Sequence, residues 1–140
     1  MSETALVVVD ASVWVSRLAP QDVFHTPVKT WLDRQRTAGV ELLSPAFLLP
    51  EVGGAISRRT APAFGRQAID LLQNLPGLRL VEMDAALILE AAHLAAELGL
   101  RGADATYVAV AARLKLPLVT LDEDQMSRAA KRVSIQEISL

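Results

Sequence analysis

The stretch LVVVDASVWV, residues 6–15, places a single carboxylate, Asp10, at the end of an apolar run. Four consecutive apolar residues before Asp10 predict a short strand that is buried on both faces, as strands of parallel sheets are. The residues that follow, 11–19, have a helical pattern. In sheets of this kind ligands bind outside the carboxyl ends of the strands, which is where Asp10 is expected to lie.

The rest of the chain repeats this alternation of strand and helix. Pro50 and Gly53–Gly54 interrupt one helical stretch, which predicts a kink or a late start there. We expect a three-layer α/β sandwich, with a mainly parallel central sheet of about four to five strands flanked by helices, as one domain over residues 1–140. The expected strands are 5–9, 41–43, 78–81, 116–120 and a weak 133–138, and the expected helices lie within 11–19, 26–39, 45–60, 61–77, 84–99 and 102–116.

Composition narrows the classes of function. The chain has 140 residues, of which 51% are hydrophobic and 21% charged, so it can bury a real core. It has no cysteine, which excludes disulfides, thiolate metal sites and a cysteine nucleophile. A net charge of −2 argues against a protein that coats nucleic acid, so any such contact must be local or use metal ions. No apolar run is long enough for a membrane span or has the flanks of a signal peptide, so we expect a cytoplasmic protein without membrane contact.

Further acids stand alone in apolar segments, as Asp10 does. Glu51 is the only charge between residues 42 and 57, and Asp104 is the only charge between residues 102 and 112. Asp122 and Asp124 follow the expected fourth strand directly. A lone charge on a buried face is costly, so this arrangement calls for an explanation.

Each acid taken alone has a purely structural interpretation. Asp10 and Asp104 suit helix N-caps, Glu51 suits an exposed helix edge, and Asp122–Asp124 suits a solvated turn. Taken together, they favour a shared site over several independent coincidences. Carboxylates brought together repel one another, and a divalent cation with oxygen ligands, Mg²⁺ or Mn²⁺, removes that repulsion.

The order of these motifs resembles PIN-domain ribonucleases, and most closely the VapC toxins of VapBC toxin–antitoxin pairs. The motifs are VVVDASVWV, PEVGGAISRR and ADATYVAVAARLKLPLVTLDED, and they extend over nearly the whole chain. The resemblance implies a parallel sheet between helices and an endoribonuclease that depends on Mg²⁺ or Mn²⁺.

By motif match, the resemblance implies four catalytic acids that also bind the metal: Asp10, Glu51, Asp104 and Asp122. It implies Asp124 as a fifth metal ligand and Ser12 and Thr120 as polar residues beside the site. The chain departs from the family pattern in two places. Gln125 stands where an aromatic residue often follows the last acid, and Gly53 and Gly54 form an unusual pair after Glu51.

The resemblance also implies partners, namely an RNA substrate and a small, partly disordered antitoxin. We further expect a homodimer, because AFLLPEVGGAI and APAFGRQAIDLL carry more apolar surface than a small monomer buries. Two alternatives stay open. One is a PIN-domain nuclease of RNA processing that has no antitoxin, and the other is a non-catalytic acidic interaction module.

Overall fold

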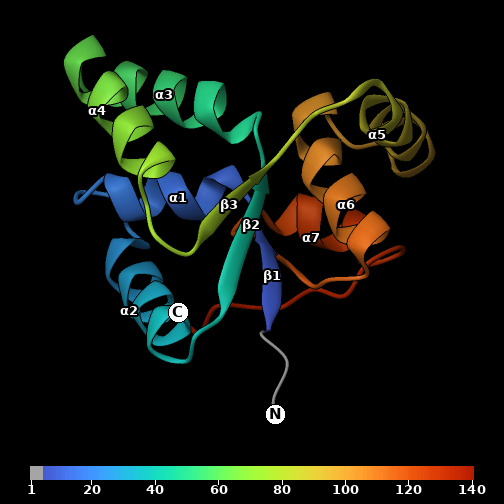
Figure 1. Ribbon diagram of the computed structural model, residues 1–140, viewed down its shortest axis with the longest axis horizontal. Coiled ribbons are helices and arrows are strands. Elements are labelled where there is room, and N and C mark those ends of the chain that lie inside the picture. Colours follow the sequence, from blue (N-terminus) through green and yellow to red (C-terminus); the bar gives the residue numbers. More distant parts are fainter. Residues whose placement is uncertain (1–4) are drawn as a thin grey trace.

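The computed structural model describes residues 5–140. Its centre is a sheet with strand order β3-β2-β1-β4, in which every pairing is parallel (Figure 1). This confirms the predicted parallel α/β architecture. The strands are β1 (Leu6–Val9), β2 (Glu41–Pro45), β3 (Leu78–Val81) and β4 (Leu118–Val119).

Helices cover both faces of this sheet. Helices α1 to α4 lie on one side and α5 to α7 on the other, which gives the expected three layers (Figure 1). Within residues 5–140, no helix has the length and apolar character needed to cross a membrane. The helices are α1 (Ala11–Leu18), α2 (His25–Thr37), α3 (Leu48–Arg59), α4 (Pro62–Gln73), α5 (Ala85–Leu98), α6 (Gly102–Leu114) and α7 (Glu123–Ala129).

Strand β1 lies inside the sheet and fixes the position of Asp10. Val8 pairs with Leu43 of β2 on one side and with Leu118 of β4 on the other, and its side chain is fully buried. The backbone N–H of Asp10 donates to the carbonyl of Val119 at 2.9 Å, so the pairing with β4 continues one residue beyond β1. Asp10 is therefore held by the sheet itself at the carboxyl edge.

The structure refines the expected helices and strands in several places. Helix α3 begins late, at Leu48, with Pro50 in the first turn, where the missing N–H has no helical partner to lose. The expected strand at 133–138 is reduced to one bridge between Ile135 and Leu118, and β4 itself is shorter than predicted. Helix α7 was not among the expected helices, because the segment after β4 was considered only for its acids, as part of a site or as a solvated turn.

Candidate functional site

Asp10 is almost fully buried, and hydrogen-bond donors surround its carboxylate. It is the N-cap of α1, where Oδ2 accepts from the backbone N–H of Ser12 at 3.0 Å. Oδ2 also lies 3.1 Å from the Thr120 hydroxyl, and Oδ1 accepts from Nε2 of Gln125 at 3.3 Å. Asp10 is thus a cap, as the structural interpretation held, and it also contacts the residues that follow β4.

Ser12 and Thr120 link the ends of β1 and β4 beside Asp10. Their hydroxyl oxygens are 3.3 Å apart, and Ser12 Oγ accepts from the backbone N–H of Leu121 at 3.0 Å. Thr120 Oγ1 accepts from the backbone N–H of Asp122 at 3.1 Å. The two hydroxyl groups therefore hold the turn that carries Asp122 against the start of α1.

Glu51 approaches the same region from the first turn of α3. Its Oε1 accepts a 2.6 Å hydrogen bond from the hydroxyl of Tyr107, a fully buried residue of α6. Burial raises the pKa of Glu51, the Tyr107 hydrogen bond opposes that rise, and the charges of Asp10 and Asp104 add to it. Glu51 is thus half-buried in the field of two other acids and does not lie on a solvated helix edge.

Arg101 connects Asp104 with Asp122. Arg101 itself is the N-cap residue of α6, so Asp104 lies in the first turn and is not the cap. Nε of Arg101 is 3.1 Å from Oδ2 of Asp104, and its Nη2 is 3.0 Å from Oδ2 of Asp122. Burial raises the pKa of Asp104, the Arg101 hydrogen bond lowers it, and Asp10 and Asp122 raise it. Asp122 Oδ1 caps α7 by accepting from the backbone N–H of Gln125 at 3.0 Å.

Asp124 lies apart from these acids. Its side chain is 74% exposed and forms an ion pair with Arg128 one turn along α7, with Nε and Oδ2 3.0 Å apart. The structure thus brings Asp10, Glu51, Asp104 and Asp122 to one edge of the sheet, from four different segments, and leaves Asp124 on the outer side of α7.

The donor chemistry of this group of four, which we call the acidic cluster, suits a hard divalent cation. Its ligand atoms are carboxylate oxygens, which hard cations prefer. Burial and neighbouring acids raise the pKa values of Glu51 and Asp104, so their ionised forms are unfavourable, and a bound cation would stabilise them. In the arrangement seen for residues 5–140, no three acidic or histidine side chains are spaced to hold one ion. Tyr107 holds Glu51 and Arg101 holds Asp104 and Asp122, so those contacts would have to rearrange.

Replacing Arg101 tests whether its guanidinium stands in for a cation. Arg101→Ala leaves Asp104 and Asp122 without their counter-charge, so we expect a melting temperature at most a few degrees lower without metal, because the ion pairs are exposed. We also expect severalfold tighter Mn²⁺ binding, because a competing cation is gone. Thermal melts and Mn²⁺ titrations measure both effects.

Arg79→Ala, which removes an exposed ion pair with Glu41, is the control that leaves Mn²⁺ binding unchanged. Weaker Mn²⁺ binding by Arg101→Ala would contradict this account.

Sequence reasoning did not assign Arg101, Tyr107 or Gln125 to the site. Arg101 directly precedes the segment in which Asp104 is the only charge, and Tyr107 is the one polar aromatic residue in that segment. Gln125 departs from the family pattern at a position where an aromatic residue often follows the last acid. The signals were present, but the contacts depend on side-chain directions that only the packed fold defines.

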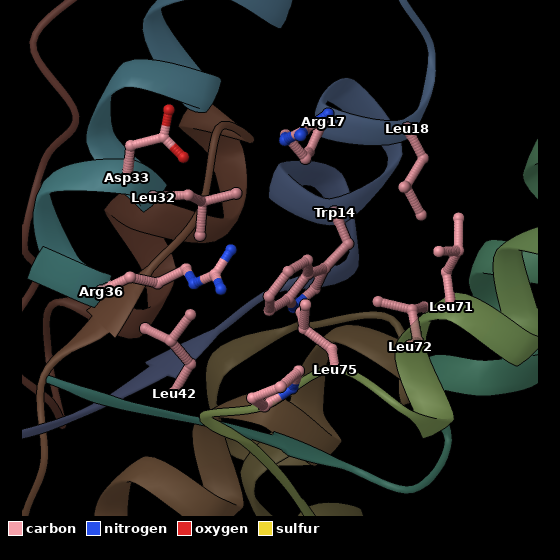
Figure 2. Close-up of a pocket in the computed structure, with 11 residues that line it drawn as sticks. Trp14, Arg17, Leu18, Leu32, Asp33, Arg36, Leu42, Leu71, Leu72 and Leu75 are labelled. Carbon is pink, nitrogen blue, oxygen red and sulfur yellow. The ribbon is translucent and has the colours of Figure 1, made fainter. Parts of the chain in front are cut away.

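A separate apolar pocket lies between α1, α2 and α4, and Figure 2 shows its lining. The pocket has a volume of about 180 Å³. Trp14, Leu32 and Leu72 contribute apolar wall, and Arg17 and Arg36 extend over it. Neither arginine forms an ion pair with another residue in the part of the chain that the structure describes. None of the acidic cluster lines this pocket.

Comparison with known proteins agrees with this fold. The family model described as PIN domain matches residues 7–132. Among solved structures, the chain is similar to the VapC20 toxin of Mycobacterium tuberculosis, described as cleaving the sarcin–ricin loop, with a TM-score of 0.75 and 19% identity over 92% of this chain and 98% of that one. It is also similar to VapBC2 of Rickettsia felis, bound to a DNA fragment from its promoter, with a TM-score of 0.73 and 13% identity over 96% of this chain and 99% of that one. For FitAcB of Neisseria gonorrhoeae, the TM-score is 0.65 and the identity 22%, over 92% of this chain and 95% of that one. No curated protein matches the sequence.

Proposed function

Because the chain belongs to the PIN domain family, we propose that it is a metal-dependent endoribonuclease that hydrolyses RNA phosphodiester bonds. The observation that carries this proposal is the acidic cluster itself. Its carboxylates come from the ends of two strands and the first turns of two helices. In addition to burial, the neighbouring acids of the cluster raise the pKa of Glu51 and of Asp104. Carboxyl groups whose pKa is raised by burial and by neighbouring charges, as in Glu51 and Asp104, are typical of functional sites.

We assign the metal-binding role to Asp10, Glu51, Asp104 and Asp122, with Mg²⁺ or Mn²⁺ as the ion. When bound, such an ion lowers the pKa of a coordinated water and neutralises charge on the phosphate. Ser12 and Thr120 orient Asp10 and the turn before Asp122. Tyr107 donates to Oε1 of Glu51, so the other carboxylate oxygen, Oε2, is the one we assign to the cation. Asp124 is the weakest candidate for a further ligand, because its side chain is 74% exposed and lies outside the acidic cluster.

The experiment that tests the proposal is cleavage of a mixed RNA pool by the purified protein with Mg²⁺, with Mn²⁺ or with EDTA. We expect cleavage with either ion and none with EDTA. Cleavage that persists in EDTA would reject the metal requirement. No cleavage under any condition, for a folded protein that binds Mn²⁺, would favour a non-catalytic acidic module.

We propose a small, partly disordered antitoxin as the partner of this nuclease in the cytoplasm. An arginine or lysine from such a partner would compete with the metal for the acidic cluster. The pocket of Figure 2 offers apolar wall for an apolar side chain of this partner. Two arginines, Arg17 and Arg36, line it against one acid, Asp33, which favours an acidic residue beside that side chain. Growth arrest on expression of the chain alone, relieved by a neighbouring small gene whose product co-purifies, is expected. An RNA-processing nuclease without an antitoxin would show neither effect.

We also propose a homodimer. The segments that suggested it expose large apolar side chains in the structure, Phe47 before α3 and Phe64 and Leu71 on α4. Large apolar side chains that stay exposed within two neighbouring segments are what an interface between subunits would cover. Light scattering at micromolar concentration should give about twice the monomer mass of 15.1 kDa. A mass near 15.1 kDa would reject the dimer.

A further inference from the structure

Gln125 is a buried amide in direct contact with the acidic cluster. It lies in the first turn of α7 with only 1% of its surface exposed. Its Nε2 donates to Oδ1 of Asp10 at 3.3 Å, and its Oε1 accepts from the Thr120 hydroxyl at 3.1 Å. Its backbone N–H donates to Oδ1 of Asp122 at 3.0 Å. One residue therefore contacts two acids of the cluster, one through its side chain and one through its backbone.

The donors and acceptors around the Gln125 side chain fix the orientation of its amide. Oδ2 of Asp10 accepts from the backbone of Ser12, whereas Oδ1 has Gln125 as its donor among residues 5–140. The Thr120 hydroxyl has one hydrogen and two acceptors at 3.1 Å, Oδ2 of Asp10 and Oε1 of Gln125. Turning the amide over would place a carbonyl oxygen against a carboxylate oxygen. Only the observed orientation supplies a donor to Oδ1 of Asp10.

We propose that Gln125 is a positioning residue that fixes the rotation of the Asp10 carboxylate for cation binding, an inference that rests on the proposed function. The terminal torsion of an aspartate is broad, so a carboxylate held at one oxygen can still swing at the other. Gln125 holds the second oxygen. An apolar residue at this position would leave Oδ1 a buried acceptor without a partner. A lysine or arginine would compete with the cation, whereas a neutral amide does not.

Gln125 also sets the relative placement of Asp10 and Asp122. Its backbone is fixed by the capping bond to Asp122 and its side chain by the bond to Asp10, so the ends of β1 and β4 are joined through a single side chain. In metal sites, groups that orient the ligands typically change metal affinity about 10–100-fold when they are removed. A residue that only fills space would change stability and leave metal affinity alone.

The test is Mn²⁺ binding by Gln125→Met, measured from the spin-resonance signal of free Mn²⁺ without RNA. Methionine keeps the length and the buried packing and removes the donor. We expect a Kd for Mn²⁺ about 10–100-fold weaker than that of the wild type. Ser16→Ala is the control, since Ser16 is also a buried polar residue but bonds Asp22 through its hydroxyl. We expect it to lower the melting temperature and to leave the Kd for Mn²⁺ unchanged.

A second measurement uses the wild-type protein, in case Gln125→Met does not fold. Titration with Mg²⁺ should shift the side-chain amide resonances of Gln125, because the bound cation draws charge from the Asp10 carboxylate to which the amide donates. The exposed amide of Asn74, which bonds the carbonyl of Asp70, is the internal reference and should not shift. Static Gln125 resonances under saturating Mg²⁺ would overturn the inference.

The outcomes separate this inference from the proposed function. If the wild type binds Mn²⁺ and cleaves RNA, and folded Gln125→Met binds Mn²⁺ within twofold of it, the positioning role is wrong and the nuclease proposal stands. If the wild type does not bind Mn²⁺ at all, the metal-dependent function is wrong, and the role of Gln125 is rejected with it.

Discussion

RNA cleavage is expected to fall at least ~100-fold in Asp10→Asn and in Asp104→Asn, while both proteins stay folded. The estimate is a lower bound, because removing residues that merely orient metal ligands already costs about 10–100-fold. Asparagine keeps the size of the side chain and removes one charge from the cluster. At position 10 it also keeps the N-cap of α1, because an amide oxygen accepts the Ser12 bond as a carboxylate does.

Without metal, Asp104→Asn should not lose stability, although it loses activity. Burial raises the pKa of Asp104 above its ordinary value, with Asp10 and Asp122 adding to the rise and Arg101 opposing it, so the ionised form is disfavoured in the folded protein. That penalty is present above the raised pKa and disappears as the pH falls below the unfolded value. Asp104→Asn should therefore melt at or above the wild-type temperature at neutral pH. The difference should shrink toward pH 4, as the wild-type carboxyl takes up its proton.

Asp124→Asn is the matched control for these changes. It removes the same charge from an acid that is exposed and paired with Arg128 outside the cluster. We expect a smaller loss of cleavage than at Asp10 or Asp104, and a Mn²⁺-induced shift in melting temperature close to that of the wild type. Full activity of Asp104→Asn, together with an unchanged Mn²⁺-induced shift, would contradict the metal-nuclease proposal.

The sequence was informative where a single pattern decides the structure. An apolar run that ends in Asp10 predicts a buried parallel strand, and parallel strands bring their carboxyl ends to one edge. The same argument placed Asp122 there. For Glu51 and Asp104, isolation in apolar segments was enough to predict burial, and both are half-buried next to other acids.

The contacts within the cluster were not predictable, because they depend on the directions of side chains from different elements. Arg101 reaches two acids 3 and 21 positions away along the chain. Tyr107 meets Glu51 across the space between α6 and α3. Helix α7 was missed for a related reason, since acids in a first turn and acids in a solvated turn have the same local sequence pattern.

The glycines after Glu51 were unusual in the sequence, and the structure gives them different environments. Gly53 is buried and faces α4, where an added Cβ would lie 2.7 Å from Cδ1 of Ile69. Gly54 faces only the end of the Arg58 side chain. The partner of Gly53 on α4 is Gly65, where a Cβ would lie 2.7 Å from the carbonyl oxygen of Gly53. Two glycines in contact therefore let α3 and α4 approach closely just beyond Glu51.

Gly65→Ala is accordingly expected to lower the free energy of unfolding by about 1–3 kcal/mol, the usual cost of overpacking a close contact. The added methyl group meets a backbone carbonyl and, at 3.1 Å, Cβ of Ser57, so α3 must shift as a unit. Because Glu51 lies half a turn before Gly53, that shift should also weaken its bond to Tyr107 and lower Mn²⁺ affinity. Urea unfolding and Mn²⁺ titration measure the two effects.

Gly54→Ala provides the matched control, with the opposite sign. Its Cβ would lie 3.1 Å from Nη1 of Arg58, the flexible end of an exposed side chain that can move away. In the interior of α3, alanine is preferred to glycine by roughly 0.5–1 kcal/mol, so this variant should be more stable than the wild type and bind Mn²⁺ equally well. Equal stability of Gly65→Ala and Gly54→Ala would mean that α3 and α4 do not meet at these glycines. The position of Glu51 would then depend on Tyr107 alone.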